Sequence, residues 1–276
     1  MKRIASLLML AARSTLWKAA GITLASCLTE AGLFLAALSG WQDTVRTAYY
    51  EYSNPMGLEG LLMQYPLSWC FRIGLVLVCA VLAFLGWEGS SRVSYTLRRL
   101  SVGHRALTLL WAGYGFFCLL FFWAAHLGTL LALCAAALPR LAPEFSGPQA
   151  LFLACYRDPY LHSLLPLDDC LLWVRNLSMC AALGTAAASF SFQRRMGRRA
   201  FAILPLAALS ALCFPLPMGS FEFGGPAEFL RPYLYDGIFY SADGLPSVLG
   251  PVQLFVSLCA LAASLCQILR RDPYEE

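Results

Sequence analysis

The segment Glu88-Gly-Ser-Ser-Arg-Val-Ser-Tyr-Thr-Leu-Arg-Arg-Leu-Ser-Val-Gly-His-Arg105 is a short basic stretch between two long apolar runs. Within it, Val93, Leu97 and Leu100 recur at i, i+4 and i+7, which predicts one apolar stripe on a short helix. The arginines lie off that stripe, as on a helix in a membrane interface. An ordinary basic loop on the inner side of a membrane would have the same composition. The segment therefore predicts an inner position at the membrane surface, and leaves open whether it contacts a dedicated partner.

The composition of the whole chain predicts a membrane protein. Of 276 residues, 59% are hydrophobic and 13% are charged, against roughly 25% charged in soluble domains. A soluble domain of this size could not bury that much apolar surface in one core. The chain also has no basic or acidic tail of the kind that predicts nucleic-acid binding. We therefore expect a multi-span protein whose surroundings are membrane lipid.

Six apolar runs predict an all-α polytopic membrane protein with six transmembrane helices in a single transmembrane domain, residues 1–276. Residues 1–18 alternate basic and apolar positions and predict an N-terminal interfacial helix, with a signal peptide as the alternative. The third run is long enough to predict one long or kinked span that projects from the membrane. The predicted spans cover about residues 19–41, 67–87, 106–138, 170–192, 200–215 and 248–269.

The segments between the spans differ in charge. Residues 42–67 and 139–169 are polar or proline-rich and predict irregular outer loops, and 216–247 predicts a long outer loop. Fourteen of the 20 Lys and Arg residues fall on the opposite, inner side, and 11 of the 16 acids fall in the outer loops. The positive-inside rule then places both the N- and C-termini inside. The fourteen inner cations are Lys2, Arg3, Arg13, Lys18, Arg92, Arg98, Arg99, Arg105, Arg194, Arg195, Arg198, Arg199, Arg270 and Arg271.

No sequence motif predicts catalysis. The chain has no His-Glu-x-x-His, no Gly-x-Ser-x-Gly and no phosphate-binding loop, so we expect no enzymatic activity and no cofactor. The three histidines, His104, His126 and His162, are scattered along the chain and predict no metal site. Most of the 11 cysteines lie in apolar runs and are interpreted as small hydrophobes. Cys155 and Cys170 share an outer loop and could pair.

Two acidic positions carry further expectations. Glu30 lies inside the first predicted span, where a carboxylate costs a few kcal/mol and usually faces the bundle interior. It is a candidate for the translocation path, or alternatively a buried helix contact to Arg175, Arg72 or a hydroxyl on another span. Asp168-Asp169 predicts the start of the fourth span, with Asp as the N-cap. That span is rich in Ala, Gly and Ser, which predicts close helix contact.

The order of these parts resembles the permease subunit of bacterial type 2 ABC exporters. An amphipathic N-terminal helix precedes six spans, a basic helical segment joins spans two and three, and the loop between spans five and six is long. The phrase Tyr95-Thr-Leu-Arg-Arg-Leu-Ser-Val-Gly-His-Arg105 is similar to the coupling-helix pattern of that family. Ser101 departs from the family's usual proline, and Gly103-His104 stands where a small polar residue is common.

The resemblance implies partners and a mechanism. The inner segment 88–105 would dock on a separate ATP-binding subunit, and a second permease subunit, identical or different, would complete a path around the first, second and fifth spans. The cargo would be amphipathic or apolar, and the location the plasma membrane, here the bacterial cytoplasmic membrane. Two alternatives remain open: a secondary transporter or small-molecule-binding protein, and a sensor or assembly protein. The residues assigned to ATPase docking are Tyr95, Leu97, Arg98, Arg99, Leu100, Val102 and Arg105.

Overall fold

The computed structural model describes residues 2–47, 57–64, 66–84, 104–141, 146–147, 149–167, 169–195, 203–214 and 245–269. In these ranges helices are the only regular secondary structure, which confirms the all-α prediction for this part of the chain. The helices are α1 (Lys2–Thr47), α2 (Leu58–Gln64), α3 (Ser68–Ala83), α5 (His104–Ala137), η1 (Leu138–Arg140), α6 (Ala150–Arg157), α7 (Pro159–Leu164), α8 (Cys170–Arg195), α9 (Ile203–Cys213) and α11 (Leu245–Leu269).

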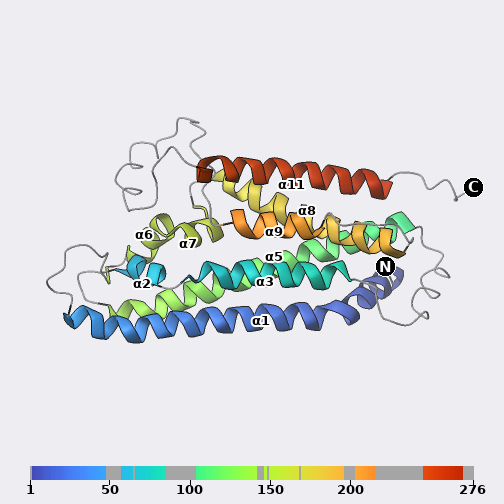
Figure 1. Cartoon of the computed structure of the whole chain (residues 1–276). Helices are drawn as coiled ribbons and strands as arrows, with labels where there is room; N and C mark the ends of the chain where they lie inside the picture. Colours follow the sequence, from blue (N-terminus) through green and yellow to red (C-terminus); the bar gives the residue numbers. More distant parts are fainter. Residues whose placement is uncertain are drawn as a thin grey trace, which may run out of the picture.

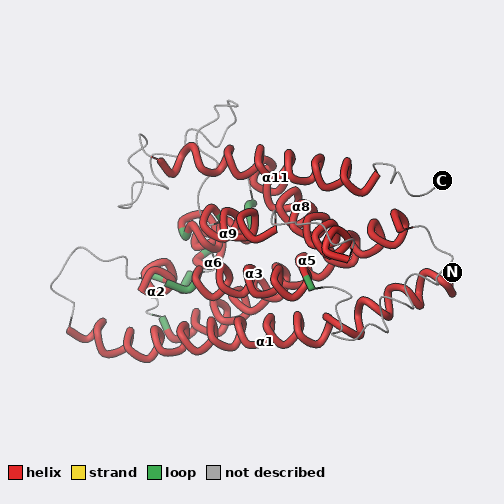
Figure 2. The backbone as a smooth tube through the Cα atoms, turned by 45° about the vertical axis from the view of Figure 1, so that its right-hand side comes forward, coloured by secondary structure: helices red, strands yellow, loops and turns green. Residues whose placement is uncertain are grey.

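The six longer helices run lengthwise in an elongated bundle (Figure 1). Neighbours pack in the pairs α1–α3, α1–α5, α3–α9, α5–α8 and α8–α11. The short helices α2, α6 and α7 lie together at one end of the bundle (Figures 1 and 2). The N-terminal end of α1 and the C-terminal end of α11 lie at the other end. The bundle therefore has two distinct ends, one closed by short helices and one where the chain begins and α11 finishes.

Within the described ranges, four helices are long and apolar enough to cross a membrane, at Ala11–Gly40, Arg105–Arg140, Cys170–Arg194 and Pro251–Leu269. Two further apolar helices, α3 and α9, are shorter, with 16 and 11 residues. Large apolar side chains such as Phe117, Phe121 and Phe255 are exposed on the outside of the bundle. Lipid tails accommodate such a surface, whereas water does not.

The N-terminal segment 2–18 is helical, with no break before the predicted first span, and its place in a membrane interface stays a prediction. It continues into the first span as one helix of 46 residues, α1, whose first turns bend away from the main axis (Figures 1 and 2). Ala11, Thr15 and Ala19 are buried, and the Thr15 hydroxyl hydrogen-bonds the Tyr114 hydroxyl of α5 at 3.1 Å. Their four-residue spacing places these small side chains on one face, so part of this segment packs in the bundle.

The segments predicted as irregular contain short helices: α2 lies in 42–67, and α6 and α7 lie in 139–169. Asp158 caps α7, because its Oδ1 accepts a hydrogen bond from the Leu161 amide at 2.7 Å and Pro159 occupies the first helical position. The Trp123 indole of α5 donates to the Leu164 carbonyl at 3.0 Å and fixes the end of α7. Propensity alone misses such short helices because packing and caps stabilise them.

The structure defines where helices α5, α8 and α11 begin. Asp169 is the N-cap of α8, as predicted: its Oδ1 accepts from the amides of Leu171 and Leu172 at 2.8 and 3.2 Å. The long third run forms a single helix that begins at His104. Of the predicted long loop 216–247, the last three residues already belong to α11, and the remainder lies outside the described residues.

Helices α5 and α8 approach each other at two glycines. A Cβ on Gly184 would lie 2.7 Å from the Phe116 amide nitrogen and 3.0 Å from the Ala112 carbonyl oxygen. A Cβ on Gly115 would lie 3.2 Å from the Gly184 Cα. These neighbours are backbone atoms of the opposite helix, so they cannot move without moving that helix. The close contact predicted from the small residues of the fourth span is therefore present.

We expect Gly184→Ala to destabilise the bundle by about 1–3 kcal/mol, because the added methyl group forces α5 and α8 apart. The matched control is Gly113→Ala on the partner helix α5, where a Cβ would meet nothing within 4 Å. The control should be neutral or slightly stabilising, since alanine is the better helix former. SDS-induced unfolding in mild detergent measures both. Equal midpoints for the two variants would contradict the close contact.

Candidate functional site

The buried face of α1 places a carboxylate inside the bundle. Its buried positions recur every three or four residues, and Glu30, at 0% exposure, lies on this stripe beside residues that are small or apolar. The stripe faces α5, with which α1 packs. Glu30 is thus held by the register of a long helix. The other buried members of the stripe are Ala11, Thr15, Ala19, Thr23, Cys27, Phe34, Ala37 and Leu38.

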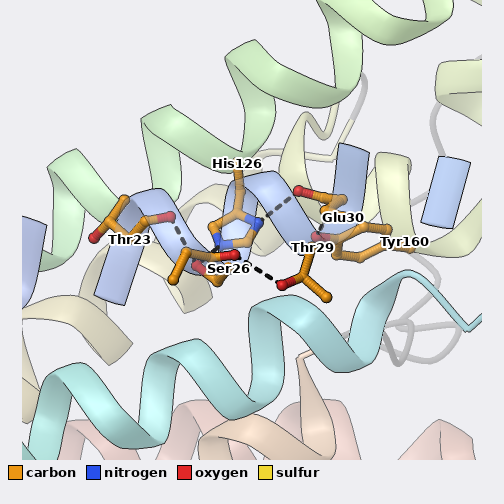
Figure 3. Close-up of polar contacts among 7 residues, drawn as sticks. Thr23, Ser26, Thr29, Glu30, His126 and Tyr160 are labelled. Carbon is orange, nitrogen blue, oxygen red and sulfur yellow. Dashed lines mark hydrogen bonds and ion pairs between the residues drawn. The ribbon is translucent and has the colours of Figure 1, made fainter. Parts of the chain in front are cut away.

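Both oxygens of Glu30 are hydrogen-bonded (Figure 3). Oε2 lies 2.7 Å from Nδ1 of His126 on α5, and Oε1 accepts from the Tyr160 hydroxyl of α7 at 2.8 Å. His126 is also 0% exposed, and Tyr160 is buried. The three side chains come from three helices, so the cluster ties α1, α5 and α7 together. Short contacts of this kind, with a charged partner, are the stronger class of hydrogen bond.

The other imidazole nitrogen of His126 continues the network. Nε2 lies 2.9 Å from the Ser26 hydroxyl (Figure 3), and that hydroxyl also lies 2.9 Å from the Thr23 carbonyl oxygen, to which it donates. A hydroxyl has only one proton to donate. Because the Ser26 hydroxyl donates it to the Thr23 carbonyl, the Ser26 oxygen accepts a hydrogen bond from Nε2–H of His126. Nδ1 of a neutral imidazole then carries a lone pair, and the 2.7 Å contact between Nδ1 and Oε2 holds one proton that His126 and Glu30 share.

The surroundings of the cluster are apolar. The ring of Phe71 meets the His126 ring edge-on with centroids 5.3 Å apart, and the Phe122 ring lies at 4.6 Å. Tyr160, which lies outside the candidate spans, is fully enclosed. Its burial, followed by the neighbouring charge of Glu30, raises the pKa of its phenol well above the ordinary value. The phenol therefore keeps its proton and acts as a fixed donor to the carboxylate.

The order hydroxyl, imidazole, carboxylate in Ser26, His126 and Glu30 is also that of a nucleophilic triad. The location does not suit that chemistry. Ser26 lies in the middle of α1, where the surrounding backbone N–H groups are bonded within the helix and are not free to form an oxyanion hole. His126 and Glu30 are fully covered, so a substrate could not reach them in this conformation. The contacts describe a buried polar cluster.

Glu30 was expected to contact a hydroxyl or one of two arginines. A hydroxyl does contact Glu30, but it comes from Tyr160 on the short helix α7 and not from another span, and the second partner is His126. Arg175 is buried elsewhere, on α8, where Nη2 donates to the Phe214 carbonyl at 2.9 Å. Arg72 lies over the ring of Trp69, 5.0 Å from its centroid. Neither arginine contributes to the cluster.

The predicted docking residues are mostly outside the described part of the chain. Arg105 is the exception, half-buried in the first turn of α5. The remaining residues, Tyr95, Leu97, Arg98, Arg99, Leu100 and Val102, fall between α3 and α5, where the structure describes nothing. Cys155 and Cys170 are both free thiols, the first buried and the second exposed, so they do not pair.

Sequence reasoning missed His126 and Tyr160 as partners of Glu30. The signal for His126 was available, because it falls on the buried stripe of α5 with Leu119, Phe122 and Leu130. A histidine on a buried stripe needs a partner, as does a glutamate on a facing one. Tyr160 had no such signal, since it lies on a short helix that the sequence did not predict.

No family model, curated protein or solved structure matches this chain. The fold and the site therefore define only a class. That class is an all-helical membrane protein with a polar cluster buried between its helices.

Proposed function

We propose that the chain is the membrane-spanning permease subunit of an ABC-type exporter, which moves an amphipathic or apolar substrate by using ATP hydrolysed on a separate subunit. The observation that carries this proposal is the order of parts along the bundle. Six apolar helices, α1, α3, α5, α8, α9 and α11, alternate in direction, and the basic segment 88–105 connects α3 to α5. In this proposal all six cross the membrane, with α3 and α9 spanning as parts of longer apolar runs.

Charge supports one orientation of the bundle. The end where α1 begins also holds the start of α5 and the end of α8, and therefore Arg105 and Arg194. The opposite end holds the caps Asp158 and Asp169. Under the positive-inside rule the first end, with both termini, lies on the cytoplasmic side of a bacterial plasma membrane.

In this mechanism the ATP-binding subunit contacts segment 88–105, and closure of the ATPases moves α3 and α5. Helix α3 packs against α1, α8 and α9, so its displacement would reach the helices proposed to line a path shared with a second permease subunit. Glu30 points into its own bundle, against α5 and α7. A place for Glu30 in the translocation path therefore requires α1 and α5 to separate during transport.

The test is co-purification of the tagged protein in mild detergent, compared with its Leu97→Glu/Leu100→Glu variant. We expect an ATP-binding subunit to co-purify with the wild type and to be lost from the variant, because two charges disrupt an apolar docking stripe. Leu269→Glu is the matched control: it places one such charge on an exposed residue at the C-terminal end of α11. That control should retain the partner.

A well-folded protein that purifies without any ATP-binding chain would contradict the proposal. The basic segment would then be an ordinary inner loop. The non-ABC alternatives, a secondary transporter, a small-molecule-binding protein or a sensor, would take precedence.

A further inference from the structure

We propose that Cys27, Glu30 and His126 form a binding site for a divalent transition metal ion of the zinc type. The sulfur, one carboxylate oxygen and one imidazole nitrogen of these residues all lie within 4.8 Å of one another, and all three residues are buried. The inference does not depend on an ATPase partner, because it rests only on the contacts between α1 and α5.

The geometry requires shifts of roughly 1 Å to hold an ion, because separations of up to 4.8 Å between the ligand atoms must close to the spacing around one zinc ion. Zinc binds sulfur at ~2.3 Å and nitrogen or oxygen at ~2.0–2.2 Å in a tetrahedral arrangement, so the ligand atoms around one ion lie roughly 3.3–3.8 Å apart. Cys27 and Glu30 are three residues apart on α1 and share one face, and His126 faces them from α5. The Nδ1–Oε2 contact of 2.7 Å would open by roughly 0.6 Å on this zinc geometry.

The atoms behind the ligands are already arranged as in metal sites. A metal-binding histidine donates its other N–H to an acceptor, and a metal-binding carboxylate is itself hydrogen-bonded. Here Nε2 of His126 faces the Ser26 hydroxyl at 2.9 Å, which in turn donates to the Thr23 carbonyl. The second oxygen of Glu30 accepts from Tyr160 at 2.8 Å. This leaves Nδ1 and Oε2 as the atoms directed at the ion.

Charge balance favours a divalent ion. With a thiolate, a carboxylate and a neutral imidazole, the ligands carry two negative charges, and a divalent cation makes the buried site neutral. Binding would release two protons, one from the Cys27 thiol and one from the proton shared by Glu30 and His126. The combination of sulfur, nitrogen and oxygen suits zinc or cobalt, and does not suit magnesium or calcium, which prefer oxygen alone.

The experiment uses the full-length protein in mild detergent, stripped with a chelator and titrated with Co²⁺, which has a visible spectrum. We expect one Co²⁺ per chain and a thiolate-to-cobalt charge-transfer band. Cys27→Ser should remove that band, and Tyr160→Phe should weaken binding by about 10-fold, since it removes the hydrogen bond behind a ligand. The matched control is Cys180→Ser, another buried cysteine, which should change neither.

A second measurement needs no variant. Because Cys27 is buried, an alkylating reagent reaches it only when the bundle opens locally, and bound Zn²⁺ should slow this reaction relative to the metal-stripped protein. The alkylation of exposed Cys259 and Cys266 should be unchanged. Absence of stoichiometric Co²⁺ binding together with unprotected Cys27 would overturn the proposal. Binding that persists unchanged in Cys27→Ser would also overturn it, because the ion would then be held elsewhere. Neither of these results would bear on the proposed ATP-binding partner, which the co-purification experiment tests separately.

Discussion

His126→Leu is expected to destabilise the protein by about 3 kcal/mol, even though leucine is apolar and of similar size. The substitution removes the partner at 2.7 Å from Glu30 and leaves a carboxyl group at 0% exposure with only Tyr160. Removing one member of a buried pair typically costs about 3–5 kcal/mol, since the other member is left without compensation. SDS-induced unfolding of the protein in mild detergent measures the loss.

The paired variant distinguishes this cause from lost packing. Glu30→Leu/His126→Leu removes both members, so most of the stability should return. His162→Leu is the matched control: it removes a buried histidine on α7 whose Nδ1 lies 3.2 Å from the Cys155 carbonyl oxygen. The His126→Leu variant and the double variant, together with Glu30→Leu, give the coupling free energy between Glu30 and His126. The average for interhelical hydrogen bonds in membranes is about 0.6 kcal/mol, and a value no larger than this would contradict the buried-pair interpretation.

Arg175→Leu is the second large expected loss, about 2 kcal/mol. The Arg175 side chain is fully buried. Its guanidinium donates to the Phe214 carbonyl at the end of α9 and, at 3.2 and 3.3 Å, to Oδ1 of Asn176. Removing the guanidinium relieves the free-energy cost of burying a cation. The substitution also leaves the Phe214 carbonyl and Oδ1 of Asn176 without this donor. The cation also lies at the negative C-terminal end of α9, where it is favoured.

Arg194→Leu provides the comparison on the same helix. Its side chain is exposed, and its guanidinium lies over the ring of Phe84 at 5.6 Å. We expect a change within about 0.5 kcal/mol, as for most surface positions. If Arg175→Leu were neutral or stabilising, the guanidinium would contribute less than its burial costs. Thermal unfolding in detergent reads both variants.

Helices were predictable from the sequence where a long apolar run determines them. The runs around 106–138 and 170–192 became α5 and α8 with small changes at their ends, because an uninterrupted apolar run satisfies its backbone only as a helix in a membrane. The short helices α2, α6 and α7 were missed because their caps and contacts, such as Asp158 with Leu161, depend on local geometry. The helix predicted over 1–18 and the first predicted span are joined in α1 without a break, and small residues such as Thr15 pack this part of α1 against α5.

The site was only half predictable. Glu30 stood out because a carboxylate in an apolar run demands a partner, and its burial is as expected. The partner His126 lies 96 positions away. A single sequence does not show which buried faces of two helices pack against each other. Tyr160 depends on the packing of α7 against α5, which includes the hydrogen bond from the Trp123 indole to the Leu164 carbonyl. Such pairings belong to tertiary packing.

Helix α1 is so long that part of it lies in lipid and part of it lies outside the membrane. Its 46 residues extend about 69 Å at 1.5 Å per residue, whereas a bilayer with its headgroups is about 40–45 Å thick. Fitting it inside would need an inclination of about 50°, beyond the usual range of roughly 0–40°. Several turns, including the first turns that bend away from the main axis, must therefore lie outside the hydrocarbon core, where amide protons exchange with deuterium far faster than those within it. The two positions along α1 where exchange slows would mark the two surfaces of the membrane.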